Sequence, residues 1–176
     1  MSEIVRAIKE FAHPCSKEKS PQDLNRAIMT TVTVARYEWQ YVANVKLDLD
    51  PSLPAVPCVL GEFNQAFLDL IVNAAHAIGD SVTAEPGGKG TITVGTRREG
   101  AQVEVRVSDT GAGIPEAVRP HIFEPFFTTK VVGKGTRPGL AIAYNSIVQR
   151  HGGTLNFESN PGKGTTFILR LPTGLR

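Results

Sequence analysis

The sequence predicts an α+β fold in which helices pack on one face of a mixed sheet. Segments with the helical spacing of apolar residues interleave with segments that alternate apolar and polar residues. Most of the alternating segments come as adjacent pairs joined by turns that contain glycine, which indicates β-hairpins. With 176 residues, 41% of them hydrophobic, the chain can bury one sizeable core, so we expect one main folded domain.

Composition excludes several classes of function. The net charge is only +2 and the basic residues are scattered, so we expect no nucleic-acid partner. The chain has no apolar run that could span a membrane and no signal peptide, so we expect a cytoplasmic domain without membrane contact of its own, whether or not the full-length protein is membrane-attached. Cys15 and Cys58 lack metal-like spacing and indicate reduced thiols.

The N-terminal half predicts two helices and one strand. Residues 1–11 have helical spacing but are too few to form a stable helix, so we interpret them as the end of a longer helix. A polar linker, His13–Pro21, precedes a helix that begins at the N-cap residue Asp23. A strand at Val45–Leu49, a proline-rich loop and the strongest helix follow, the last at Glu62–Ile78.

The C-terminal half predicts two hairpins separated by a helix. The first hairpin pairs residues 91–97 with residues 101–108, and the second pairs residues 154–158 with residues 165–171. Between them, Pro138 suits the first turn of a helix that runs to Gln149, with His151-Gly152-Gly153 as its end.

One stretch, VSDTGAGIP (107–115), places an acidic residue where an apolar strand ends. Residues two apart in a strand share a face, so Asp109 points the same way as Val103, Val105 and Val107. On a core-facing strand its carboxylate would lie at the bottom of an apolar pocket and need a hydrogen-bond donor, such as a ligand amine. The glycines that follow would let the ligand approach closely. A tight Asp-Gly turn explains the same residues equally well.

Three further stretches offer groups that suit a phosphate-bearing ligand, and each also has a plainer explanation. Asn73 has an amide oxygen that suits Mg2+, although a polar residue on a solvated helix face is the simpler interpretation. In Phe123–Lys130, the lysine could reach a phosphate or be solvated, while the aromatic residues could simply close the core. The glycines of Gly133–Gly139 expose backbone N–H groups at a helix start, which suits an anion, but a flexible loop fits them as well.

Together and in this order, the four stretches resemble the ATP-binding catalytic domain of sensor histidine kinases, within the gyrase, heat-shock chaperone, histidine kinase and mismatch-repair ATPase superfamily. LIVNAAHAI resembles the N box, VSDTGAGIP the first glycine box, IFEPFFTTK the F box, GKGTRPGLAIAY the second glycine box and GKGTTFILRLP the closing strand. The resemblance implies a Bergerat-type fold, a two-layer α/β sandwich, for residues 22–176. It implies the end of a dimerisation helix and a linker for residues 1–21.

The resemblance also implies how the domain would hold ATP and Mg2+. Asn73 would bind the metal ion, and Asp109 would accept a hydrogen bond from the adenine amino group. Gly113 and Ile114 would line the base, and Thr166 matches a position that helps to fix the adenine edge.

At the phosphate end, His76 lies where the family often has a lysine or another polar residue. Lys130 and the lid Gly133–Leu140 would cover the triphosphate. The expected nucleotide-binding residues are Asn73, His76, Ala77, Asp109, Gly111, Gly113, Ile114, Lys130, Gly133, Gly135, Thr136, Gly139, Leu140 and Thr166. The expected catalytic residues are Asp69, Asn73 and Lys130.

Two positions depart from the family pattern. The family usually has Asn where this chain has Asp69, and hydrolysing members of the superfamily use an acidic general base there. Asp69 could therefore activate water, although a tolerated near-isostere is the simpler interpretation. Arg137-Pro138 replaces a glycine and a small or polar residue, and proline pushes the residue before it to extended angles. We therefore expect a lid that is less ordered or binds nucleotide more weakly.

None of the four histidines stands in a phosphoacceptor box, so we expect the target histidine on a helical domain outside this sequence. The domain alone should bind Mg-ATP without autophosphorylating. The predicted function is the catalytic domain of a two-component sensor kinase, which transfers the γ-phosphoryl group of ATP to that histidine, with the receiver domain of a response regulator as a further partner. Two alternatives stay open: an ATP-hydrolysing enzyme with Asp69 as base, and a degenerate nucleotide-sensing or interaction module.

Overall fold

The computed structural model describes residues 5, 18–82, 88–124 and 139–174. The strands in these ranges are β1 (Ser20–Gln22), β2 (Ala43–Asp48), β3 (Val56–Cys58), β4 (Gly90–Glu99), β5 (Gln102–Asp109), β6 (Thr154–Asn160) and β7 (Gly164–Pro172). The helices are α2 (Leu24–Val34), α3 (Arg36–Trp39), α4 (Leu60–Val82), the 3-10 helix η1 (Glu116–His121), α5 (Gly139–Tyr144) and the π-helix η2 (Asn145–Arg150).

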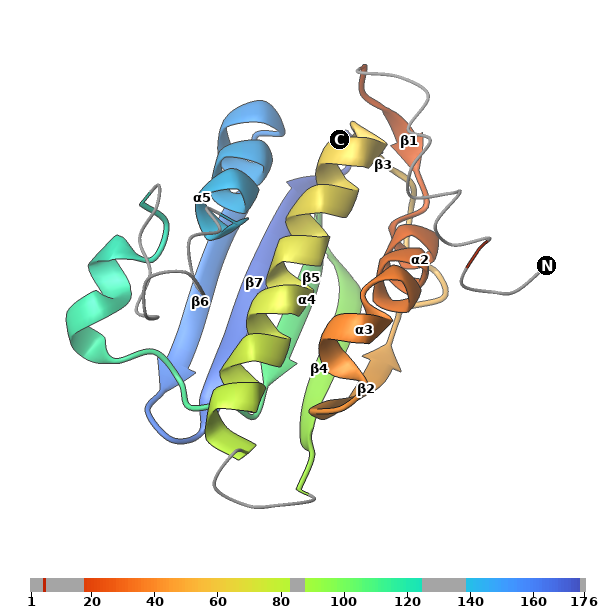
Figure 1. The fold of residues 1–176 in the computed structure, drawn as a ribbon. Helices are drawn as coiled ribbons and strands as arrows, with labels where there is room; N and C mark the ends of the chain where they lie inside the picture. Colours follow the sequence, from red (N-terminus) through yellow and green to blue (C-terminus); the bar gives the residue numbers. More distant parts are fainter. Residues whose placement is uncertain (1–4, 6–17, 83–87, 125–138, 175–176) are drawn as a thin grey trace.

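The main sheet has five strands in the order β2-β4-β5-β7-β6. The β2–β4 pair is parallel and the other three pairs are antiparallel, so the sheet is mixed. Helices α2, α4 and α5 lie over one face of this sheet, with α4 across its middle (Figure 1). The predicted class, an α+β sandwich with helices packed on one face of a mixed sheet, is confirmed.

The core lies between α4 and the covered face of the sheet, which we call the inner face. On β5 the alternating residues Val103, Val105 and Val107 are buried on this face, as their period of two predicts. The opposing stripe of α4 is formed by the buried residues Phe63, Phe67, Leu70, Ile71, Ala74, Ala75 and Ile78. Within the described ranges, no helix combines the length and the apolar character that crossing a bilayer would require.

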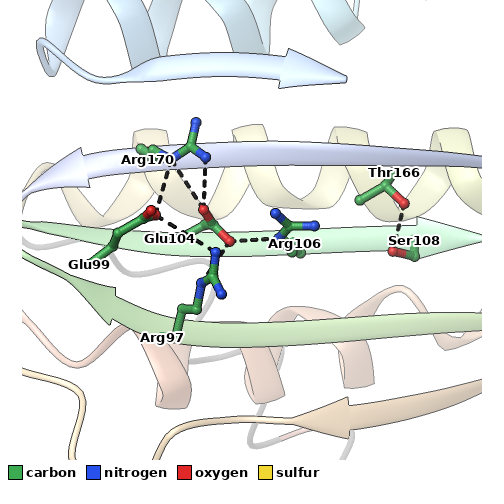
Figure 2. A network of polar contacts seen from close by, with 7 residues as sticks. All are labelled: Arg97, Glu99, Glu104, Arg106, Ser108, Thr166 and Arg170. Carbon is green, nitrogen blue, oxygen red and sulfur yellow. Dashed lines mark hydrogen bonds and ion pairs between the residues drawn. The ribbon is translucent and has the colours of Figure 1, made fainter. Parts of the chain in front are cut away.

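The opposite, outer face of the sheet carries a charged network centred on Glu104, whose side chain is fully buried (Figure 2). Arg97 and Arg170 are its direct cross-strand partners on β4 and β7. Their Nε and Nη2 atoms lie 3.0 and 2.9 Å from the carboxylate, and Arg106 Nε lies 2.6 Å from it. Burial alone would raise the pKa of Glu104, but the hydrogen bonds from Arg106 and Arg97 outweigh it and lower the pKa from 4.5 to about 2.

Several predicted elements have different limits in the structure. The helix that begins at the N-cap Asp23 breaks at Ala35, after which α3 forms a separate short turn. The segments 20–22 and 56–58, expected in a linker and a loop, form a two-stranded sheet in which Pro21 pairs with Pro57. Strands of three residues that contain proline show no alternation from which to predict them. The C-terminal helix changes from α to π form at Asn145.

Candidate functional site

The carboxylate of Asp109 is the most informative group of the site. It lies on the inner face in line with the buried valines of β5, as predicted, and is only 6% exposed. Its Oδ1 accepts a hydrogen bond from the backbone N–H of Gly111 at 2.9 Å. Its Oδ2 is buried and has no hydrogen-bond partner among the described residues. Burial raises the pKa of Asp109, and the backbone N–H groups of Gly111 and Thr165 oppose that rise.

Backbone from two other segments approaches the end of β5 so closely that glycine is required there. A Cβ on Gly111 would lie 2.7 Å from the carbonyl group of Ala77 on α4. Gly164, the first residue of β7, has a φ of +107°, and a Cβ there would collide with the backbone oxygen of Asp109. These contacts fix the end of β5 between α4 and the β6–β7 hairpin.

Thr166 does not lie where the sequence predicted. It is on the outer face of the sheet, where its Oγ1 is 2.9 Å from Ser108 Oγ (Figure 2), so it cannot share a pocket with Asp109. Its neighbour Thr165 is buried and is the direct cross-strand partner of Asp109. Because side chains alternate along a strand, an error of one residue moves the expected group to the wrong face. Thr165 therefore replaces Thr166 in the candidate site.

The α4 residues predicted to bind metal and phosphate differ in their surroundings. Asn73 is half-buried, and Asp69 lies one turn earlier on the same helix. Gln65 Nε2 donates a hydrogen bond to Asp69 Oδ1 at 3.0 Å, which holds this carboxylate against its own helix. His76 Nε2 lies 3.3 Å from Glu38 Oε2, so its ring is turned towards α3. The expected role of His76 near the phosphates stays a prediction.

The remaining predicted residues fall into two groups. Gly113 and Ile114 are half-buried in the loop between β5 and η1, and Leu140 packs against the core at the start of α5, one residue after Gly139. Phe123 closes the core beside them, with its ring centroid 4.9 Å from that of Tyr144. The predicted residues Lys130, Gly133, Gly135 and Thr136, together with Arg137-Pro138, lie outside the described residues.

One buried histidine was predicted only as part of a helix end. The Val59 N–H donates to His151 Nε2 at 3.1 Å, so the other ring nitrogen, Nδ1, carries the proton and donates to the Ser146 carbonyl at 2.7 Å. His151 thereby joins the start of α4 to the end of η2. Its sequence signal, a histidine before two glycines, gives no hint of a partner far along the chain.

Comparison with known proteins agrees with this geometry. The family model described as Histidine kinase-, DNA gyrase B-, and HSP90-like ATPase matches residues 60–175. These residues include α4, the end of β5 with Asp109, and the β6–β7 hairpin. The chain belongs to this ATPase family, and membership implies that the domain binds a nucleotide.

Within the family, similar proteins are sensor histidine kinases. Sensor protein TdiS of Thauera aromatica is 32% identical over 97% of this chain, and the match covers 30% of that protein. Sensor histidine kinase ZraS of Escherichia coli (strain K12) is 32% identical over 99% of this chain and 36% of its own length. The chain thus spans about a third of the length of these relatives.

Solved structures identify the part of these kinases that the chain corresponds to. The nucleotide-free catalytic domain of histidine kinase ThkA has a TM-score of 0.74 and 27% identity, with 89% of this chain and 98% of that domain covered. ThkA in complex with response regulator protein TrrA has a TM-score of 0.70 and 27% identity, over 97% of this chain and 46% of that one. The chain therefore has the fold of a histidine kinase catalytic domain.

Proposed function

We propose that residues 22–176 bind Mg-ATP and present its γ-phosphoryl group to a histidine on a helical domain outside this sequence. The domain would then be the catalytic part of a two-component sensor histidine kinase that works in the cytoplasm, where ATP is available. The sensor kinases among its relatives and the catalytic domain of ThkA support this proposal. The ThkA–TrrA complex supports a receiver domain as a further partner.

The orphaned Oδ2 of Asp109 is the observation that carries the proposal. A buried oxygen without a donor is unfavourable in the empty domain, and a ligand amine relieves that cost when it binds. Adenine offers such an amine on its edge, whereas guanine has an oxygen at the same position. The carboxylate therefore favours adenine, and Thr165 lies next to it on the same face.

Asn73 is the residue that would hold Mg2+. An amide oxygen is a hard ligand, and Mg2+ usually takes only one or two protein ligands together with substrate phosphates and water. When bound, the metal ion neutralises charge on the phosphates during transfer. Lys130 and the lid Gly133–Leu140 would complete the phosphate end of the site, as the family resemblance implies.

Titration of the domain with ADP and ATP, with and without Mg2+, tests the binding half of the proposal. We expect binding that Mg2+ strengthens and that Asp109→Ala abolishes, while the fold, followed by circular dichroism, is kept. Asp48→Ala is a matched control, because Asp48 is an exposed aspartate on β2. No binding by the wild-type domain at millimolar nucleotide would overturn the proposal in favour of a degenerate module.

Transfer is tested by mixing the domain with γ-labelled ATP and the histidine-bearing helical domain of the full-length protein. We expect an acid-labile phosphohistidine on the added domain and no label on the catalytic domain alone. Steady release of phosphate without the acceptor, lost in Asp69→Asn, would instead indicate an ATP hydrolase that uses Asp69 as its base.

A further inference from the structure

The loop that follows Asp109 is held in place by the β6–β7 hairpin. This loop, residues 110–115, joins β5 to η1 and contains Gly113 and Ile114. The N–H of Gly162, in the hairpin turn, donates to the carbonyl of Ala112 at 2.7 Å. The N–H of Ile114 donates to the hydroxyl oxygen of Ser159 on β6, also at 2.7 Å. The loop backbone is therefore attached to the hairpin at two points.

Ser159 also connects this loop to the strand position beside Asp109. Its Oγ lies 2.9 Å from Thr165 Oγ1 and donates to the carbonyl of Gly164 at 3.3 Å. Ser159 is the direct partner of Thr165 across β6 and β7, and Thr165 is in turn the partner of Asp109 across β7 and β5. The three side chains thus lie in one row across three strands, on the inner face.

Arg119, on η1, forms hydrogen bonds with the same loop and with β6. Its Nη2 donates to the Ser159 carbonyl at 2.7 Å and its Nε to the Ile114 carbonyl at 3.3 Å. Strand β6 is at the edge of the sheet, and no further strand of the described residues pairs with it on that side. One guanidinium group therefore joins the edge of the sheet to the loop. Both backbone polar groups of Ile114 are held, its N–H by Ser159 and its carbonyl by Arg119.

We propose that Ser159 and Arg119 are positioning residues for adenine recognition. The proposal rests on the function proposed above, with Asp109 as the group that accepts from the base. Ser159 and Arg119 hold the loop backbone next to that carboxylate in the nucleotide-free domain, so little ordering remains to be done when the base arrives. Without them, a smaller fraction of molecules has the loop in the arrangement that binds the base. The apparent dissociation constant for nucleotide rises in inverse proportion to this fraction.

The experiment measures ADP affinity and the hydrogen exchange of residues 110–115 in the nucleotide-free domain. The variants are Ser159→Ala and Arg119→Met, with Ser159→Thr as the conservative variant that keeps the hydroxyl. Ser108→Ala is the matched control, since it removes a serine hydroxyl bond of similar length on the outer face of the same sheet. Arg119 is only half-buried on a short surface helix, so we expect Arg119→Met to fold. This variant still tests the inference if Ser159→Ala fails to fold.

We expect ADP affinity to fall about tenfold in Ser159→Ala, which loses the hydroxyl that joins the loop to Thr165, and about threefold in Arg119→Met. Exchange should rise in residues 110–115 and stay unchanged in the middle of β5 and β7, while Ser159→Thr restores both measurements. If ADP affinity stays within about twofold of wild type in both Ser159→Ala and Arg119→Met, the inference is wrong. The inference is also wrong if Ser108→Ala loses as much ADP affinity, or if affinity falls without faster hydrogen exchange in residues 110–115. Failure of the wild-type domain to bind ADP would instead contradict the proposed function.

Discussion

Strand β5 carries two buried carboxylates on opposite faces of the sheet, and their surroundings are opposite too. Glu104 faces outwards and is fully buried under the side chains of Arg97, Arg106 and Arg170. Asp109 faces inwards, where its Oδ1 accepts from the Gly111 N–H and its Oδ2 has no hydrogen-bond partner among the described residues. The pKa of Glu104 is lowered to about 2, and the pKa of Asp109 is raised.

On the proposed function, the difference separates a carboxylate that stabilises the fold from one that binds a ligand. The negative charge of Glu104 is balanced by arginine side chains of the chain itself, two of them on the neighbouring strands β4 and β7. No ligand is needed to offset the cost of burying this charge. Asp109 is left with an uncompensated oxygen, and this cost is what a bound amine removes. Both carboxylates are buried, so the proposed binding role of Asp109 rests on its unpartnered oxygen and not on burial alone.

The largest expected effect is that of Asp109→Asn on nucleotide binding. The amide keeps an oxygen for the Gly111 N–H but presents its NH2 group to the adenine amine, so two donors meet. We expect ADP affinity to fall about 100-fold or more, as when a buried site meets a ligand that leaves its groups unpaired. Calorimetric titration measures this loss, and ADP binding at wild-type strength would show that Asp109 does not contact the base.

The same substitution should stabilise the empty domain. Because the pKa of Asp109 is higher in the fold than in the unfolded chain, its ionised form opposes folding. This cost is absent below the unfolded pKa of 3.8 and complete once the pH exceeds the folded pKa. At neutral pH, Asp109→Asn should therefore raise the temperature midpoint of unfolding of the nucleotide-free domain. A lowered midpoint would show that the ionised carboxylate of Asp109 does not oppose folding.

Glu104→Gln should have the reverse pattern, with loss of stability and unchanged binding. The substitution removes the charge and leaves three guanidinium groups close together. Since these groups are partly exposed, we expect a loss of about 3 kcal/mol, which for a domain of this size lowers the midpoint by roughly 6–12 °C. ADP affinity should stay within about twofold of wild type, because the network lies on the far face of the sheet.

The pH dependence of unfolding tests whether the ion pairs of Glu104 cause the loss of stability in Glu104→Gln. A carboxylate whose pKa is depressed in the fold stabilises it above the unfolded pKa, and the contribution disappears as the pH falls through the folded value. For Glu104 this window runs from 4.5 down to about 2. Wild-type stability should decrease more steeply than that of Glu104→Gln over this range, so that the two curves converge. Parallel curves would mean that the ion pairs do not stabilise the domain.

The two carboxylates also show how far the sequence could predict the molecule. Asp109 was predictable because three valines at a period of two fix its face and two glycines follow it. Glu104 falls on the opposite parity of the same strand, where a charged residue indicates solvent. Its burial depends on Arg97 and Arg170, which only the register of β4 and β7 brings to it. The fold class, α4 and both hairpins follow from local pattern, but the pairing of β5 with β7, which are distant in the sequence, does not.

The residues missed at the site have the same origin. Ser159 follows the predicted strand 154–158, and Arg119 lies where the sequence predicted no element. Their shared partner, Ile114, is distant in the sequence from Ser159. The sheet of β1 and β3 was missed because two proline-containing segments of three residues have no pattern of their own. Apart from the contact of Arg119 with Ile114, five residues away, these misses are pairings between distant segments.

The smallest expected effect separates Thr165 from Thr166, neighbours that differ only in the face they occupy. Thr165→Val removes the hydroxyl that contacts Ser159 beside Asp109, while Thr166→Val removes one that contacts Ser108 on the outer face. Valine keeps the shape and the strand preference of threonine, so each variant tests one hydroxyl. We expect ADP affinity to fall about fourfold in Thr165→Val and less than about twofold in Thr166→Val. Equal losses would mean that binding does not distinguish the two faces, and a larger loss in Thr166→Val would restore the residue that the sequence alone suggested.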